Sequence, residues 1–352
     1  MKKLILSFFA VASLFSCSKS DIIYSEQEAH IGFSPIANTI VKSVANSTNT
    51  ENFAYPTNLD LYVFANAQAD DLSQSWPSPY FTNAKFIYNR LNNNVYEGDP
   101  ARFWPNVKSL IFAGYSGNVG TLSTDPTMNF DSDILTIEDY IQDNAKGYTT
   151  SDSDNSTTSV VGGNDLMWFS KTTAYTKQAA AIPVTMHHAC SWITVKVVGD
   201  EVTGGEWILK ELKINNLYHE GTAQCGASSA SWTTSGDRDA EILYSNGTTA
   251  IPTIETGAQT YENVADNMVV IPQVPTTIDV TYSFVPQEGV DPITETTTGL
   301  SLSIGKDAQG QELLWESGKH YIYTITITAT EILIDPKVDV WTPHTVTPGT
   351  TI

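Results

Sequence analysis

Basic residues and cysteines are scarce in this chain. Only 18 of its 352 residues are Lys or Arg, against 39 Asp or Glu, so the formal net charge is −21. A protein this acidic repels the phosphate backbone of nucleic acids, and we therefore expect no DNA or RNA partner. Three cysteines are too few for a disulfide framework, so the fold has to depend on apolar cores.

Charged residues of either sign are also few. They make up 16% of the chain, whereas an ordinary soluble domain has about 25%. Hydrophobic residues nevertheless amount to 41% and aromatic residues to 11%, which is enough apolar surface for sizeable cores. The polar surface must then consist mostly of Ser, Thr, Asn and Gly. This composition is typical of extracellular β proteins, and the length predicts two domains.

The beginning of the chain has the features of a bacterial lipoprotein signal. Two lysines precede the apolar residues 4–14, and the small residue Ser16 stands directly before Cys17. The apolar run is too short to span a bilayer as a helix. We therefore expect residues 1–16 to be removed and Cys17 to receive acyl chains such as palmitate. These chains would attach the protein to the outer membrane.

Alternation of apolar and polar residues is the main pattern in the rest of the sequence. It is clearest in residues 278–284, 300–304, 321–328 and 334–341, and it also occurs in residues 59–63. Strands of this kind have one buried face and one solvent-exposed face, as in antiparallel sheets. The pattern predicts an all-β protein with at most one or two short helices.

Two local features interrupt the simple alternation. The apolar parity changes within residues 184–198, and we expect a β-bulge near Ser191 or Trp192 to accommodate the change. A capping-box spacing from Thr136 to Asp139, followed by apolar residues at helical spacing, predicts one short helix. One helix of this length leaves the fold class unchanged.

The expected domain boundary follows Lys177, ahead of the strong strand pattern that begins near residue 184. This division gives an N-terminal β-sandwich domain of residues 17–180 and a C-terminal β-sandwich domain of residues 181–352. No charge run or proline-rich linker marks the boundary, so it depends on the strand pattern alone.

Sequence motifs for catalysis, metals and cofactors are mostly absent, and the near misses are weak. The sequence has no glycine-rich phosphate loop, no nucleophile elbow and no paired-histidine zinc helix. His187 and His188 are neighbours on an expected strand, so their side chains point to opposite faces and do not easily chelate one ion. We expect no enzymatic activity, no metal and no cofactor. Cys190 and Cys225 are the remaining cysteines, and the sequence leaves open whether they form a disulfide.

Aromatic residues gather in the N-terminal half. They are Trp76, Tyr80, Phe81, Phe103 and Trp104. In a β-sandwich such residues usually belong to the core, but exposed rings can stack on sugars. A surface lipoprotein that binds glycans for a polysaccharide-uptake system is therefore the alternative function.

Several segments together resemble one protein family in their content and order. After the lipoprotein signal come Ile31-Gly32-Phe33, Leu61-Tyr62-Val63-Phe64-Ala65, Asp165-Leu166-Met167-Trp168 and residues 184–198, followed by Trp315, Gly318, Tyr321, Tyr323, Ile325 and residues 338–341. In this order they resemble the fimbrillin family of Bacteroidales surface lipoproteins over essentially the whole chain.

The resemblance implies two transthyretin-like, Greek-key β-sandwiches in series and a role as a fimbrial structural or accessory subunit in adhesion. In that family a trypsin-like protease removes the first strand of a lipidated precursor, and a strand from a neighbouring subunit fills the groove. The expected partners are other fimbrial subunits, with host or bacterial surface molecules as ligands. The donor strand would lie in residues 331–352, with Val338, Val340 and Trp341 as its contact residues.

One departure from the family concerns the cleavage site. Family members usually offer an arginine, but this chain has none before Arg90, and Lys42 is the only Lys or Arg between Lys19 and Lys85. A protease that accepts lysine would cut between Lys42 and Ser43 and remove residues 17–42. Alternatively the subunit is never cut, stays attached to the membrane and serves as a base or accessory component.

Overall fold

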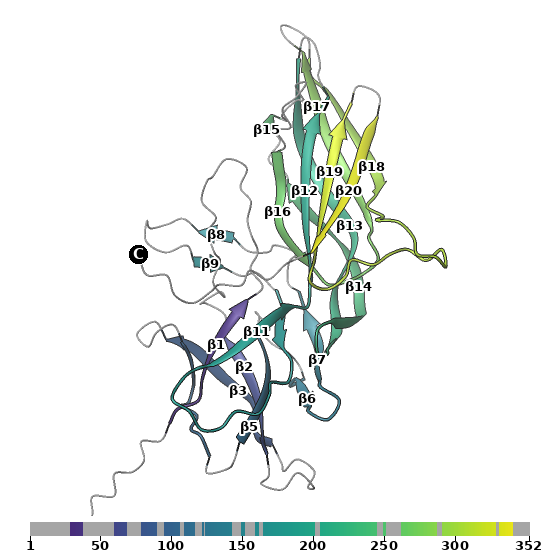
Figure 1. The fold of residues 1–352 in the computed structure, drawn as a ribbon. Helices are drawn as coiled ribbons and strands as arrows, with labels where there is room; N and C mark the ends of the chain where they lie inside the picture. The colour runs from purple at the N-terminus through teal and green to yellow at the C-terminus, as the bar shows by residue number, and fades with distance from the viewer. Residues whose placement is uncertain are drawn as a thin grey trace, which may run out of the picture.

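All regular elements in the described part of the chain are β-strands (Figure 1). The computed structural model describes residues 29–37, 60–68, 79–89, 95–105, 109–116, 122, 124–142, 149–151, 159–161, 165–200, 205–244, 249–250, 262–286, 291–328 and 331–340. Within these residues there is no helix, and hence none that is long and apolar enough to cross a membrane. The all-β prediction is therefore confirmed.

Seven strands form a closed barrel, in the order β1-β11-β10-β5-β2-β3-β4. Their bounds are β1 Gly32–Ala37, β2 Leu61–Gln68, β3 Pro79–Asn89, β4 Val95–Gly98, β5 Ser109–Ser116, β10 Met167–Phe169 and β11 Ile182–His188. The barrel encloses an aromatic-rich core that includes Phe33, Phe86 and Phe112. Seven of the first eleven strands thus form a closed barrel, whereas we expected a two-sheet β-sandwich in this half.

Two further sheets pack face to face, and all their strands except β6 and β7 come from the C-terminal half. One has the order β16-β12-β19-β20, with β12 Ser191–Gly199, β16 Glu262–Val270, β19 Lys319–Ile327 and β20 Ile332–Val340. The other has the order β18-β17-β13-β7-β6, with β6 Thr127–Asn129, β7 Ile134–Ile141, β13 Gly205–Cys225, β17 Thr277–Pro286 and β18 Ile293–Ser301. A continuous apolar core from both sheets makes this half a β-sandwich.

Three short or peripheral pairings complete the described elements. β14 (Ala230–Tyr244) and β15 (Thr249–Ala250) both pair with β13, and β8 (Thr149–Ser151) pairs with β9 (Ser159–Val161). A third apolar cluster joins the barrel to the sandwich, because it contains Tyr115 and Trp168 from the barrel together with Ile137 and Cys225 from β7 and β13. The two halves therefore share buried surface.

The helix predicted from Thr136 is wrong. Residues in that stretch form β7, which pairs antiparallel with β13 and with β6. Leu135 and Ile137 are buried in the manner of alternate strand residues, whereas Ile141 is half-exposed. Cross-strand pairing and burial thus outweigh a local capping-box spacing, which is a weak signal on its own.

The parity change in residues 184–198 comes with a change of sheet rather than with a bulge at Ser191 or Trp192, and the register shifts of β12 against β16 lie further along, between Ile193 and Lys196. The chain bends at Ala189 and Cys190, leaves the barrel at the end of β11 and enters the sandwich as β12. Two strands in two sheets need not share one buried parity. The change from barrel to sandwich also does not coincide with the expected boundary after residue 180. β11 follows this boundary but belongs to the barrel, whereas β6 and β7 precede it but belong to a sandwich sheet.

Candidate functional site

The site predicted from the sequence lies at the two ends of the chain. Cys17, Lys42, Ser43 and Trp341 are outside the described residues, so their predicted roles stay predictions. Val338 and Val340 lie in β20, the last described strand. The first described strand, β1, falls within the segment expected to be removable.

β1 is inserted between two strands that are far from it in sequence. It pairs in parallel with β11, from Phe33 opposite Ile182 to Ala37 opposite Met186, and antiparallel with β4, where Phe33 lies opposite Tyr96. Figure 1 shows β1 beside β11 at the side of the barrel. β1 lies between β11 and β4, so without β1 the barrel would open there and each of these two strands would have an unpaired edge.

The residues before β1 also join the barrel. The Ile31 amide donates to the Arg102 carbonyl at 2.8 Å, and the Trp104 amide donates to the Ala29 carbonyl at 3.0 Å. A Cβ atom added at Gly32 would lie only 2.8 Å from Val95 Cγ1. β4 can therefore approach this closely because Gly32 has no side chain. Residues 29–33 are therefore held by β4 and the residues that follow it, residues 33–37 are held by β11, and Phe33 has a partner strand on each side.

Phe33 is the central apolar contact of β1. Its side chain is fully buried, with ring centroids 4.9 Å from Phe86 and 5.2 Å from Phe112 in edge-to-face geometry. Burial of one such side chain stabilises the fold by about 1.5–3 kcal/mol, and the aromatic pairs add about 0.5–1.5 kcal/mol each. Removal of β1 would leave an apolar slot in the barrel wall.

β20 is the edge strand of its sheet. Its register with β19 runs from Lys319 opposite Val340 to Ile327 opposite Ile332, and in the sheet order it has no second neighbour. Figure 1 shows it as the last strand beside β19. Leu333 and Val338 are 50% and 49% exposed. β20 therefore combines a one-sided ladder with solvent-exposed apolar side chains.

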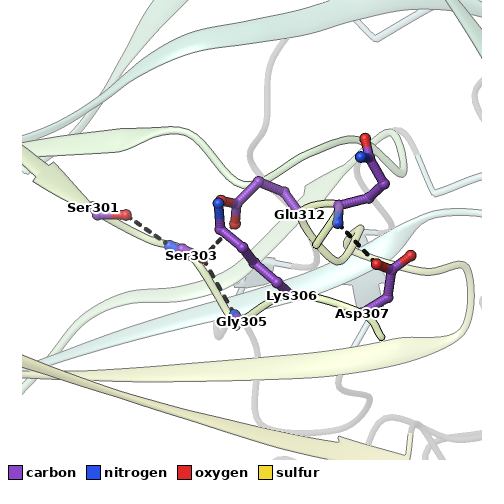
Figure 2. Close-up of polar contacts among 7 residues, drawn as sticks. Ser301, Ser303, Gly305, Lys306, Asp307 and Glu312 are labelled. Carbon is purple, nitrogen blue, oxygen red and sulfur yellow. Dashed lines mark hydrogen bonds and ion pairs between the residues drawn. The ribbon is translucent and has the colours of Figure 1, made fainter. Parts of the chain in front are cut away.

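Polar contacts fix the connection between β18 and β19 (Figure 2). The Ser303 hydroxyl donates to the Glu312 carboxylate at 2.7 Å, and Lys306 Nζ lies 3.0 Å from the same carboxylate. Asp307 Oδ1 accepts hydrogen bonds from the backbone amides of Gln309 and Gln311. The Ser303 and Lys306 contacts hold the pKa of Glu312 below its usual value. These groups satisfy one another, so we interpret the connection as structural.

The two cysteines are free thiols in this structure. Cys190 and Cys225 are both buried in the cluster between barrel and sandwich. Burial raises the pKa of each thiol well above its ordinary value, because the thiolate would lose its hydration. Both are therefore protonated and weakly reactive in this environment.

The two histidines of the predicted strand have different surroundings. His188 Nδ1 lies 2.6 Å from Asp165 Oδ2, and both side chains are buried. His187 is half-buried, and its ring centroid is 5.2 Å from that of Trp168. Burial, followed by electrostatic interaction with the neighbouring His188, lowers the pKa of His187. Among the described residues no group of three or more His, Cys, Asp or Glu could hold a metal ion.

Two of the five aromatic residues considered as a sugar platform belong to the barrel core. Phe81 and Trp104 are buried in the barrel cluster, and Trp76 lies outside the described residues. Tyr80 is 39% exposed, and its hydroxyl donates to the Phe103 carbonyl at 2.9 Å. The described rings therefore do not form one flat, exposed surface for stacking on a sugar.

Comparisons with known proteins agree with the fold. The sequence model of a family described as fimbrillin-like matches residues 45–341. A fimbrial protein from Bacteroides vulgatus ATCC 8482 has a similar fold, with a TM-score of 0.54, 12% identity, and coverage of 88% of this chain and 99% of that one.

A fimbrial assembly protein from Parabacteroides distasonis ATCC 8503 is a more distant match, with a TM-score of 0.33 and 13% identity; the match covers 89% of this chain and 100% of that one. No curated protein matches the sequence.

Proposed function

Because this chain belongs to the fimbrillin-like family, we propose that it is a non-catalytic structural or accessory subunit of a fimbrium on the bacterial surface. In this proposal the subunit joins its neighbours by β-strand addition and takes part in adhesion to host or bacterial surfaces. It would reach the surface as an outer-membrane lipoprotein acylated at Cys17.

The position of β1 is the observation that carries the proposal. β1 belongs to the N-terminal segment, yet it fills a slot between two distant strands, β4 and β11. Lys42 follows β1 in the sequence, so a cut between Lys42 and Ser43 would separate β1 from the rest of the chain. The open edges and the space of Phe33 would then favour a replacement strand.

The donor in this proposal is the segment of residues 331–352 of a neighbouring subunit. Its described part, β20, pairs with β19 alone, so release would break only one ladder. Val338, Val340 and Trp341 would provide the apolar contacts in the acceptor slot. If Lys42 is not cut, β1 keeps its own slot occupied, and the subunit would remain at the base of the fimbrium.

Proteolysis of the purified full-length chain tests this function. We expect a trypsin-like protease to leave Ser43 as the new N-terminus, and the cut chain to form oligomers that resist mild detergent. A Lys42→Gln variant is the control and should stay uncut at this position and monomeric. Cut chains that remain strictly monomeric at high concentration would contradict a role in the fimbrial stalk.

A second experiment tests the donor segment. A synthetic peptide of residues 331–352 should bind the cut chain and should not bind the uncut chain, because β1 then occupies the slot. A Val338→Asp peptide should bind far more weakly, because a carboxylate would have to be buried. Equal binding of both peptides would show that this segment is not the donor.

A further inference from the structure

β19 is the strand through which a pulling force would leave this subunit. In the proposed assembly, one neighbour holds residues 331–352 of the chain, and a strand of the other neighbour fills the slot beside β11. A pull along the fimbrium therefore acts on the chain just after Ile327, the last residue of β19, and on β11 in the barrel. The inference below rests on the proposed function and concerns how the folded chain bears this load.

β12 and β19 run in the same direction, away from the barrel. The chain ends the barrel strand β11 at His188 and begins β12 at Ser191, so the start of β12 lies next to the barrel. β19 pairs in parallel with β12, from Trp192 opposite His320 to Gly199 opposite Ile327. Figure 1 shows the two strands side by side along the sandwich, with the barrel strands gathered at one end. Ile327 is therefore at the end of β19 that is remote from the barrel.

A pull between the barrel and Ile327 loads this strand pair in shear. β12 is held at its first residue through β11, and β19 is pulled at its last residue, so the strands separate only by sliding along each other. Sliding strains all hydrogen bonds of the ladder together, because they join the two strands at even spacing along the whole pair. If both strands were pulled at the same end, the ladder would open one residue pair after another, at a lower force.

β12 is the main support of β19 once β20 has left. Among the described strands β19 pairs with β12 and β20 alone, so strand exchange leaves it with the β12 ladder. β12 is itself held on its other edge by β16. Tyr321, Tyr323 and Ile325 on β19 are buried in the sandwich core, so their side chains would also have to leave that core when β19 slides.

Hydrogen bonds brace the end of the pair that lies next to the barrel. The Ser191 hydroxyl donates to the Glu316 carbonyl at 2.8 Å, which ties the start of β12 to the residues before β19. The Trp232 indole N–H on β14 donates to the Ala189 carbonyl at 2.7 Å, at the bend between β11 and β12. These contacts hold the bend in place, so a pull on β11 is passed on to β12.

We propose that the parallel pair of β12 and β19 is the load-bearing clamp of the subunit. The eight facing residue pairs from Trp192–His320 to Gly199–Ile327 resist a pull together and keep the sandwich folded under tension. Strand exchange determines how subunits are joined, whereas the clamp determines the force at which the chain between two joints unfolds. Forced unfolding is governed by the unfolding rate, so this property is separate from equilibrium stability.

Single-molecule force spectroscopy of the full-length chain tests the clamp. Handles are joined to Thr185→Cys on β11 and to Glu331→Cys after β19, both at exposed positions. Cys17→Ser removes the remaining reactive thiol, since Cys190 and Cys225 are buried. The handles take the place of the neighbouring subunits and load the ladder in shear. We expect one main rupture at high force.

The matched control changes only the direction of loading. It keeps Thr185→Cys and moves the second handle to Glu316→Cys, an exposed position just before β19, so that β12 and β19 are pulled apart from the same end. We expect the rupture force to be several-fold higher with the handle at position 331 than at position 316. Equal forces in the two geometries, or a higher force at position 316, would overturn the proposal.

Core truncations separate the clamp from general stability. Ile325→Ala on β19 and Ile278→Ala on β17 remove the same groups from one apolar core, in which both side chains are fully buried. Both should lower the urea concentration at the unfolding midpoint. With the shear handles, Ile325→Ala should lower the rupture force more than Ile278→Ala, because β17 stays in place while β19 slides. Equal losses of rupture force in the two variants would contradict the clamp.

The outcome is independent of the assembly experiments. A chain that never forms a fimbrium would still show the difference between the two pulling geometries, because the handles replace its partners. Conversely, a chain that assembles after cleavage but ruptures at equal force in both geometries would keep the proposed function and lose the clamp.

Discussion

β1 and β20 are the strands nearest to the two ends of the described chain, and they differ in their surroundings. β1 has a paired strand on each side and places Phe33 in the barrel core. β20 has a paired strand on one side only, and Leu333 and Val338 are about half-exposed. The apolar slot is therefore occupied at the N-terminal strand, whereas apolar contact surface remains available at the C-terminal strand.

This difference indicates what each strand can contribute to strand exchange. A strand buried on both sides leaves open edges and an apolar slot when it is lost, so it defines an acceptor. A strand at a sheet edge can leave with the loss of one ladder, so it suits a donor. The comparison can be tested without any partner, through the stability of single substitutions on each strand.

The largest effect is expected at Phe33. Phe33→Ala should lower the free energy of unfolding by about 3–5 kcal/mol, because it creates a cavity between Phe86 and Phe112. Leu333→Ala on β20 is the matched apolar truncation and should cost less than about 1 kcal/mol, since half of its side chain is already in water. Urea denaturation followed by circular dichroism measures both. Similar losses of unfolding free energy in Phe33→Ala and Leu333→Ala would contradict the proposed difference between the two strands.

An intermediate effect is expected at Tyr323, on the strand that holds β20. Its hydroxyl accepts from Trp315 Nε1 at 2.8 Å and donates to the Leu302 carbonyl at 2.7 Å. Tyr323→Phe should cost about 1–3 kcal/mol, because it leaves a buried donor and a buried acceptor without this partner. Tyr282→Phe is the control, since that hydroxyl donates to Glu295 at a partly exposed position. Equal losses in thermal denaturation would contradict this account.

Much of the fold follows from local sequence patterns. Alternation predicts the strands that include residues 278–284 and 321–327, because one face of each packs in the sandwich core. It cannot predict that β1 pairs in parallel with β11, because that contact joins segments about 150 residues apart in the chain. The helix predicted at Thr136 is wrong for the same reason: pairing with β13 is not visible in the local sequence.

The candidate sites are predictable to a smaller extent. Ile31-Gly32-Phe33 indicates a first strand, but the sequence does not identify the slot that it fills. Asn66 is buried although it follows an apolar run and has no motif around it, and the irregular pairing of β2 with β3 at Thr82 and Asn83 is not visible in either segment alone. Buried polar groups of this kind become visible only when neighbouring strands are placed around them.

The smallest effect is expected at Asp279 on β17, whose carboxylate forms an ion pair with Lys213 on β13. Its carboxylate accepts the Gly299 amide at 2.8 Å and lies 3.1 Å from Lys213 Nζ. Burial alone would raise the pKa of Asp279, but these contacts and one from Asn215 outweigh it and hold the pKa below its usual value. The stabilisation is therefore present above about pH 4, where an unfolded Asp is ionised, and it is lost as the pH falls through the lower folded pKa.

Asp279→Asn should consequently lower the free energy of unfolding by no more than about 1 kcal/mol at pH 7. This deficit relative to the unsubstituted chain should shrink as the solution is acidified. The control is Phe33→Ala, because its deficit comes from lost apolar burial and should stay constant over the same pH range. Urea denaturation at a series of pH values measures both. If the loss of unfolding free energy in Asp279→Asn did not shrink on acidification, the charge of Asp279 would not be its cause. Packing rather than charge would then stabilise the sandwich at this position, as it does at the β1 slot.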